Sequence, residues 1–221
     1  MTFRGWPAEA FDFYDELEAH NNRSWWLDHR EIYDTSVKAP FDELAAAVAD
    51  EFGELHLFRP NRDVRFARDK SPYKTTAAAM AERDGGSTYY VQISAEGLFV
   101  GSGMYHLARD QLQRFRDALL DDRTGTPIAS ITDLLERAGY EVGAADSLKT
   151  APRGWKVDHP RIALARRKGL IISRTFPRSK WQSTAKALDR IIGAWRDAEP
   201  MNAWLDTHVG PSEIPPDGWP S

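Results

Sequence analysis

One short stretch, residues 61–75, holds more side chains capable of chemistry than any other segment of the chain. Between residues 59 and 74 there are six basic and two acidic residues, a local charge of +4 in a chain of formal charge −4. Guanidinium and ammonium groups at this density suit an anion, which they bind through charge-assisted hydrogen bonds. Asp69 is a candidate general base and Tyr73 a candidate hydroxyl donor. The cations that we predict to hold the ligand are Arg62, Arg65, Lys70 and Lys74.

The same stretch has a structural interpretation. Aspartates that stand among arginines often serve to pair them. Asp63 and Asp69 could therefore neutralise their neighbours in an ion-pair network, or act as catalytic groups or metal ligands. The sequence leaves both interpretations open.

A second basic region lies between residues 159 and 180, with seven basic residues and no acidic one. Such a run usually marks a solvated face, although charge polarised this strongly along the chain favours a basic surface or cleft. Alternation along residues 170–176 places Arg174 on the same face as the apolar Ile172. A guanidinium among apolar groups needs a partner, so we expect Arg174 to meet Asp63, Asp69 or a bound anion.

Two glycines, Gly101 and Gly103, share one face of a predicted strand and leave a strip without side chains. Either a packed helix or a ligand could approach that strip closely. We predict that residues 61–75 and 159–180 meet beside it and line one electropositive depression. The Gly101-Ser-Gly103 sequence resembles a dinucleotide fingerprint only superficially, because its strand belongs to a hairpin instead of a parallel unit.

The elements that must position these residues indicate an α+β fold. Short alternating or apolar runs predict strands at 64–66, 88–94, 98–104 and 170–176, and a three-residue loop joins the second and third as a hairpin. Apolar residues at helical spacing predict helices. The main ones are expected at 40–53, 109–120 and 126–139, after Ser179, and from Pro200 onward. We predict a single domain over residues 1–209, a mainly antiparallel sheet covered by amphipathic helices, followed by an irregular proline-rich tail at 210–221.

Composition narrows the functional classes. The formal charge of −4 argues against a general nucleic-acid or membrane coat, because non-specific phosphate binding depends on an excess of Lys and Arg. There is no cysteine, and no two of the six histidines stand three or four residues apart, so we predict no metal site. No signal peptide or apolar membrane span is evident, which makes a cytoplasmic location the expectation. The sequence indicates no cofactor and does not define the oligomeric state.

Several motifs resemble one known family in matching order over residues 8–208. The most specific are Arg62-Asp-Val-Arg-Phe66 and Asp69-Lys-Ser-Pro-Tyr-Lys74, preceded by Trp25-Trp26. Further matches are Asn21-Asn22, Tyr33, Lys38-Ala-Pro40, Tyr89-Tyr90, Gly101-Ser-Gly103, Arg116 and Gly154-Trp-Lys-Val-Asp-His-Pro160. This is the bacterial and fungal family known as domain of unknown function 2461. The chain departs from it at Tyr105-His106-Leu107, where the family tends to have an aromatic residue and Met-Pro, and the resemblance implies no catalytic residue or substrate.

Two functional classes follow from the residues. The leading one is an enzyme or binder that acts on an anionic small molecule, with phosphorylated compounds among the candidates, through the basic residues 62–74. The alternative is a noncatalytic module that binds nucleic acid or an acidic partner through a basic face. A concave pocket would favour the first class, and a flat basic face the second.

Overall fold

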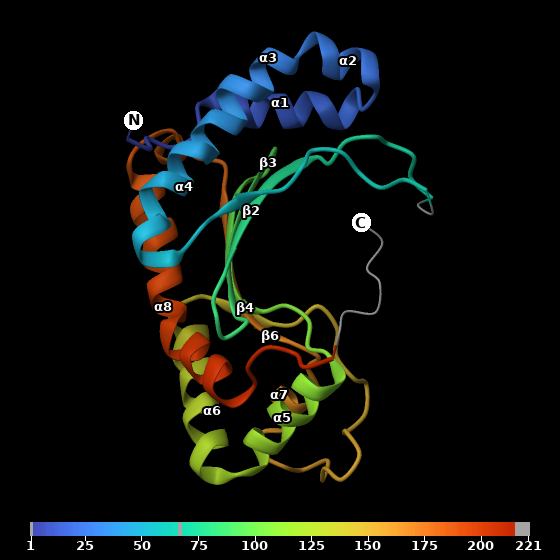
Figure 1. The fold of residues 1–221 in the computed structure, drawn as a ribbon, viewed down its shortest axis with the longest axis vertical. Helices are drawn as coiled ribbons and strands as arrows, with labels where there is room; N and C mark the ends of the chain where they lie inside the picture. Colours follow the sequence, from blue (N-terminus) through green and yellow to red (C-terminus); the bar gives the residue numbers. More distant parts are fainter. Residues whose placement is uncertain (1, 66–67, 215–221) are drawn as a thin grey trace. The chain divides into compact units, whose positions relative to one another are not determined.

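The computed structural model describes residues 2–65 and 68–214, which form an α+β fold around one six-stranded sheet (Figure 1). The described residues group into two compact units. Unit 1 lies within Met1–Ala81, Tyr89–Val100 and Thr175–Ala194, and unit 2 within Glu82–Thr88, Gly101–Arg174 and Trp195–Ser221. In sheet order, the strands are β1 (His56–Leu57), β2 (Thr76–Glu82), β3 (Thr88–Ser94), β4 (Gly97–Met104), β6 (Leu170–Pro177) and β5 (Glu141–Gly143).

The sheet is antiparallel, which confirms the predicted fold class. β1 pairs with β2 through His56 opposite Met80, and β5 pairs with β6 through Val142 opposite Ile172. Only two residues join β3 to β4, a connection too short for anything but a hairpin. Buried and half-buried residues alternate along β3, as expected for a strand with one face in the core.

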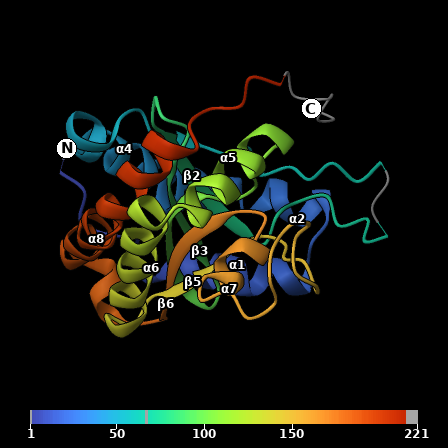
Figure 2. The ribbon, with the colours of Figure 1, turned by 90° about the horizontal axis from the view of Figure 1, so that it is seen from below.

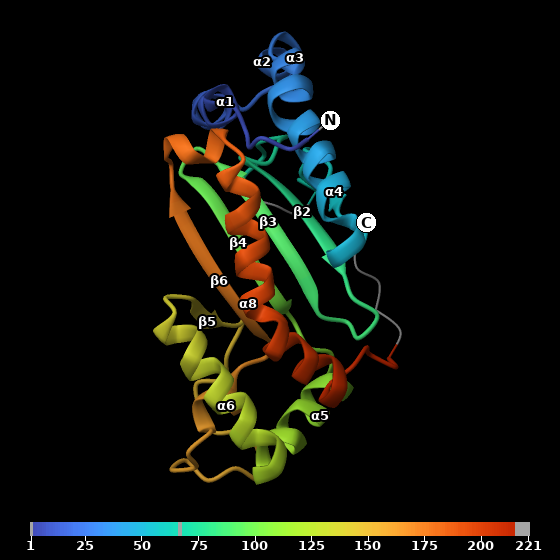
Figure 3. The same cartoon turned by 90° about the vertical axis from the view of Figure 1, so that its left-hand side faces the viewer.

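Unit 1 holds the N-terminal helices, and its core is rich in aromatic residues. α4 buries Leu44, Val48 and Phe52 and ends at Gly53, whose φ of +82° suits a residue without a side chain. Figures 1 and 3 show α4 and the first half of α8 over the same face of the sheet. The helical elements are α1 (Ala8–Ala19), α2 (Arg23–Asp28), α3 (Arg30–Ile32), the π-helical η1 (Tyr33–Lys38), α4 (Ala39–Phe52), the 3₁₀ turn η2 (Lys180–Ser183) and α8 (Lys186–His208).

Unit 2 is built on α5 (Arg109–Leu120), α6 (Asp122–Arg137), α7 (Ile162–Arg166) and the last part of α8. Only Asp121 separates α5 from α6, and the two helices pack against each other (Figure 2). Phe115, Leu119 and Ile128 are fully buried and form the apolar centre of this unit. No helix within residues 2–65 or 68–214 has both the length and the apolar character needed to cross a bilayer.

The predicted strand at 64–66 is wrong for the residues that can be judged. Val64 and Arg65 lie in a loop, and Phe66 lies outside the described residues. Among the strands that the sequence did not predict are β1 and β2, and Ala77, Ala79 and Ala81 of β2 are buried. The chain therefore enters the sheet earlier than expected, at His56, and its first long strand begins only at Thr76.

Two predicted helix boundaries are also wrong, and both involve proline. α6 begins at Asp122, capped by the Asp121 carboxylate, so Pro127 lies inside it. α8 runs through Pro200 without a break. An interior proline usually ends a helix. Here α8 continues because Met201 and Leu205, which follow the proline, are fully buried in the core. Tertiary packing outweighs the local preference at this position.

Candidate functional site

The central stretch, residues 61–75, forms a loop that is closed at its base. Asn61 and Tyr73 form an isolated antiparallel bridge. On either side of it, the Arg62 N–H donates to the Pro72 carbonyl at 2.9 Å and the Lys74 N–H to the Pro60 carbonyl at 2.8 Å. The described residues 63–65 and 68–71 therefore lie between two backbone segments that are hydrogen-bonded to each other.

Tyr73 anchors this loop to the N-terminal helices. Its N–H donates to the Asn21 side chain at 3.1 Å, and the Asn21 amide donates back to the Tyr73 carbonyl at 2.9 Å. The Tyr73 ring stacks on the Trp26 ring with centroids 4.1 Å apart and is 7% exposed. These contacts explain the tyrosine by packing, and its predicted role as a hydroxyl donor stays a prediction.

Two ion pairs brace the loop from within. The Arg65 guanidinium donates to both carboxylate oxygens of Asp63. The distances are 3.0 Å from Nε to Oδ1 and 2.6 Å from Nη2 to Oδ2. Arg62 donates from Nη1 to Asp69, which also accepts hydrogen bonds from the Ser71 hydroxyl and N–H. The hydrogen bonds from Ser71, with help from Arg62, hold the pKa of the Asp69 carboxyl well below its usual range. A carboxylate of such low basicity is a weak general base.

The two lysines also have contacts inside the loop region. Lys70 donates from Nζ to the Val64 carbonyl at 2.9 Å. The Lys74 ammonium lies 5.5 Å from the centre of the Phe58 ring, and burial lowers its pKa. Each of the four predicted ligand-binding cations thus makes a specific contact within the protein, as the structural interpretation expects. Their role in ligand binding stays a prediction.

We expect the Asp63 carboxyl to titrate at a pKa of about 2, because hydrogen bonds from the Arg65 side chain favour its ionised form. Arg65→Gln should raise that pKa towards the usual aspartate value. Because the folded-state pKa lies below that of the unfolded chain, the pair stabilises the loop above the unfolded pKa and loses this effect as the pH falls through about 2. The measurement is the pH dependence of the Asp63 carboxyl carbon shift by NMR.

Arg68→Gln is the control for this titration, because it removes an exposed cation of the same loop. It should leave the Asp63 midpoint in place. An Asp63 midpoint that is equal in the wild type and in Arg65→Gln would contradict the ion pair.

Arg174 belongs to unit 2, where it closes the end of a helix. Its guanidinium donates to the Ala138 and Gly139 carbonyls, just beyond the last turn of α6, and its Cζ lies 4.0 Å from the centre of the Tyr140 ring. A cation at a helix C-terminus is favoured by the helix dipole and satisfies carbonyls that lack helical partners. These contacts give Arg174 partners within unit 2, and its expected meeting with Asp63, Asp69 or a bound anion stays a prediction.

Gly103 is explained by the close approach of another strand. Its φ is +124°, and a Cβ at this position would lie 2.3 Å from the Leu170 carbonyl oxygen. At Gly103, the backbone of β6 therefore occupies the space beside the predicted strip without side chains. Gly101 is buried in β4. Because Gly101, Gly103 and Arg174 fall in unit 2 and residues 61–75 in unit 1, the predicted meeting of the two regions stays a prediction.

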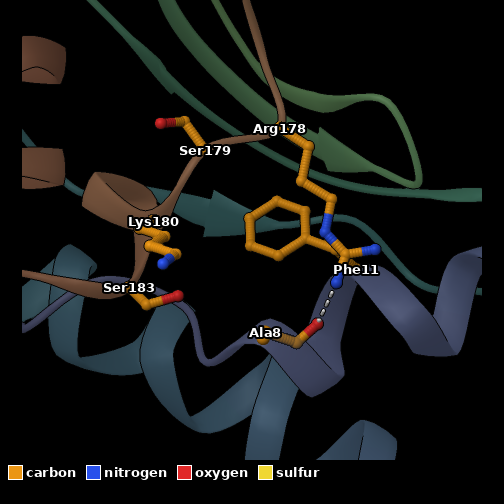
Figure 4. Close-up of a pocket in the computed structure, with 6 residues that line it drawn as sticks. All are labelled: Ala8, Phe11, Arg178, Ser179, Lys180 and Ser183. Atoms are coloured by element: carbon orange, nitrogen blue, oxygen red, sulfur yellow. Dashed lines mark hydrogen bonds between the residues drawn. The ribbon is translucent and has the colours of Figure 1, made fainter.

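A pocket of about 350 Å³ opens in unit 1, where the chain leaves β6 and enters η2 (Figure 4). It combines two cations, two hydroxyl groups and an apolar wall. Its lining residues are Ala8, Phe11, Arg178, Ser179, Lys180 and Ser183. In the view of Figure 4 the Phe11 ring lies between the Arg178 guanidinium and the Lys180 ammonium.

A buried glutamine fixes the turn that carries this pocket. Gln182 is fully buried, accepts a hydrogen bond from the Ser179 N–H at 3.0 Å and donates to the Phe176 carbonyl at 3.0 Å. Ser179 and Gln182 thus open a 3₁₀ turn, and α8 begins only at Lys186, later than the helix expected directly after Ser179. Backbone hydrogen bonds from the Arg178 N–H to the Glu96 carbonyl and from the Trp6 N–H to the Gln182 carbonyl hold the backbone of this turn in place.

Arg178 is held from two directions. Its N–H donates to the Glu96 carbonyl at 2.8 Å, and its Nη2 donates to Asp12 at 2.6 Å and to the Ala8 carbonyl at 3.2 Å. Its Cζ lies 5.6 Å from the centre of the Phe11 ring. The hydrogen bonds of the Arg178 guanidinium to Asp12 and Ala8 both use Nη2, so Nε and Nη1 have no acceptor among the described residues. Lys180 makes no hydrogen bond or ion pair with them either.

Helix α1 separates the pocket from the central loop. Its first turns carry Ala8 and Phe11, and Asn21, which holds Tyr73, follows its last turn. Twelve residues of α-helix span roughly 18 Å, so the pocket and the loop lie at opposite ends of this helix. Sequence reasoning included Arg178 and Lys180 in the second basic run but missed Ala8, Phe11 and Ser183.

No group of three or more His, Cys, Asp or Glu side chains within residues 2–65 and 68–214 could hold a metal ion. The lining of the pocket consists of two cationic side chains, two hydroxyl groups, an alanine and a phenylalanine.

The comparisons with known proteins address the family. Residues 9–204 match the family described as "Conserved hypothetical protein (DUF2461)". No curated protein and no solved structure matches the chain. The match covers most of the 221 residues and agrees with the resemblance carried by Trp25-Trp26 and the motifs of residues 62–74. The chain belongs to the family of conserved hypothetical proteins DUF2461.

Proposed function

We propose that this protein binds a small anionic molecule, of the phosphorylated or carboxylated class, in the pocket lined by Phe11, Arg178 and Lys180. The observation that carries the proposal is the placement of two cations beside an aromatic ring in a concave site of about 350 Å³. That volume lies at the lower end of the range for small-molecule pockets. A concave site favours a small-molecule binder over a flat interaction face.

The chemistry of the lining defines the ligand class. Lys180 and the outward nitrogens of Arg178 can donate to the oxygens of an anionic group, and such bonds are about twice as strong as neutral ones. Phe11 is 1% exposed, and the part of its ring that lines the pocket belongs to an apolar wall, which suits an apolar portion of the ligand. A single anionic head on a flat apolar body satisfies both halves of the pocket. The lining contains no histidine or carboxylate that could activate Ser179 or Ser183, so the proposal concerns binding.

Lys180→Gln tests this proposal, with phenyl phosphate as the probe in a calorimetric titration. Removing one charge-assisted hydrogen bond, which contributes about 1.5–3 kcal/mol, should weaken phenyl phosphate binding by about tenfold or more. Lys180 is the better position to change, because Arg178 also holds Asp12 and Ala8. Wild-type binding should also weaken as salt is added.

Lys38→Gln is the matched control, because Lys38 is an exposed lysine of the same unit that pairs with Asp42 and does not line the pocket. Its phenyl phosphate affinity should equal that of the wild type. Equal affinities in the wild type and Lys180→Gln would overturn the proposal. Binding of a short single-stranded oligonucleotide in preference to phenyl phosphate would support the interaction module instead.

A further inference from the structure

Three arginines of unit 2 carry buried nitrogens that have no hydrogen-bond partner in the part of the chain that the structure describes. The atoms are Arg116 Nη2, Arg166 Nε and Arg167 Nη1. Buried polar groups in folded proteins are nearly always paired, because each lost hydrogen bond to water costs free energy. Three unpaired guanidinium nitrogens in one region therefore require an acceptor from outside the described residues.

The backbone at the end of one short helix connects these arginines. Arg116 lies on α5, and its Nε donates to the Ala165 carbonyl at 3.2 Å in the last turn of α7. Arg166 is the final residue of α7, and Arg167 follows it. The Arg116 guanidinium thus touches the peptide unit that leads directly into the other two arginines.

The backbone around them is fixed by long-range hydrogen bonds. The Leu148 N–H donates to the Arg166 carbonyl at 2.7 Å, and Ser147 forms an antiparallel bridge with Arg167. The next residue, Lys168, accepts from the Leu107 N–H at 2.8 Å and pairs with Asp146 through its ammonium. Because the peptide units are held in place, the arginines are presented without the entropy cost of ordering a loop.

The local charge favours an anion. Burial lowers the pKa of both Arg116 and Arg167, while Glu136 on α6 acts against this at Arg167. One glutamate balances only part of the charge of three arginines. Planar guanidinium groups match the oxygens of phosphate and carboxylate in paired hydrogen bonds.

We propose that Arg116, Arg166 and Arg167 form a second ligand site, in unit 2, for a multivalent oxyanion of the phosphate class. An anion with several acceptor oxygens supplies partners for all three buried nitrogens and balances the excess positive charge. The site shares no residue with the pocket of Phe11 and Lys180, so this proposal does not depend on the proposed function.

The test uses the full chain with inorganic pyrophosphate as the probe. The arginine Nε–Hε signals of Arg116 and Arg166 are followed by NMR as pyrophosphate is added, after assignment with Arg116→Lys and Arg166→Lys. Both signals should shift with a single midpoint. Arg167→Gln should move that midpoint about tenfold higher, since it removes one of the three cations and leaves the observed groups in place.

Arg137→Gln serves as the matched control. Arg137 is an exposed arginine of α6 whose Nε donates to the Asp133 carbonyl of its own helix. Its removal should leave the pyrophosphate midpoint unchanged. The proposal is overturned if the Arg116 and Arg166 signals do not respond to pyrophosphate, or if Arg167→Gln and Arg137→Gln shift the midpoint equally.

Discussion

Gly103→Ala is expected to lower the free energy of unfolding by roughly 3 kcal/mol. A φ of +124° is strained for any residue with a side chain, which costs about 1–3 kcal/mol. The new Cβ would also lie 2.3 Å from the Leu170 carbonyl oxygen and 2.9 Å from the Ile171 Cα. Both obstacles are backbone atoms of β6, so relief requires the strands to move apart, at about 1–3 kcal/mol for an overpacked site. Urea unfolding followed by circular dichroism measures the loss.

Gly193→Ala provides the matched comparison, since it adds the same methyl group to α8. Nothing lies within 4 Å of a Cβ there, and alanine is the better helix former by up to about 1 kcal/mol. The two alanines should therefore change stability in opposite directions. If Gly103→Ala lowered the free energy of unfolding by less than about 1 kcal/mol, β4 and β6 could move apart at little cost. That result would contradict the close approach of the two strands in the structure.

The sheet shows how far local sequence could predict this fold. Strands β3, β4 and β6 were predicted within one residue, because their β-branched and aromatic residues favour extended structure. β2 was missed because Thr76–Glu82 is rich in alanine, which has little preference for strands. Its extended form comes from pairing, with His56 opposite Met80, and pairing across the sheet leaves no local signal.

The false strand at 64–66 has the opposite cause. Val64 alternates with its charged neighbours over three residues, a pattern too short to determine which backbone it pairs with. The actual bridge joins Asn61 to Tyr73, and two prolines, Pro60 and Pro72, contribute the carbonyl groups beside it. Neither proline resembles a strand residue in isolation.

The sequence predicted the cations of the candidate site but not the residues that they contact. Counting charges identified the cations of residues 62–74 and of the second basic run, but their partners decide what each cation does. Arg178 meets the Ala8 carbonyl across 170 positions in the sequence. Such a contact depends on the packing of α1 against the end of β6, which neither composition nor periodicity reveals. The orphaned nitrogens of Arg116 and Arg167 are likewise a property of burial alone.

Arg161→Met is expected to destabilise the protein by about 3 kcal/mol or more. Arg161 is 7% exposed and binds the end of α5, donating from Nε to the Leu119 carbonyl at 2.6 Å. Its Nη2 reaches Asp122 at 2.6 Å and the Leu120 carbonyl at 3.4 Å. Methionine fills similar space but leaves both carbonyls without their donor, and a hydrogen bond from a charged group contributes about 1.5–3 kcal/mol. The carbonyls dominate this loss, because Asp122 is 88% exposed and water can replace its partner.

Arg123→Met separates this effect from the general loss of a positive charge at the junction between α5 and α6. Arg123 is 88% exposed and pairs with Asp121, so its replacement should change stability by no more than about 0.5 kcal/mol. Urea unfolding of the two variants under identical conditions gives the difference directly. Equal stability of Arg161→Met and Arg123→Met would contradict the prediction. It would show that the hydrogen bonds from the buried guanidinium to the end of α5 do not stabilise the fold. A large difference would identify Arg161 as the cation in the second basic run that the fold itself requires.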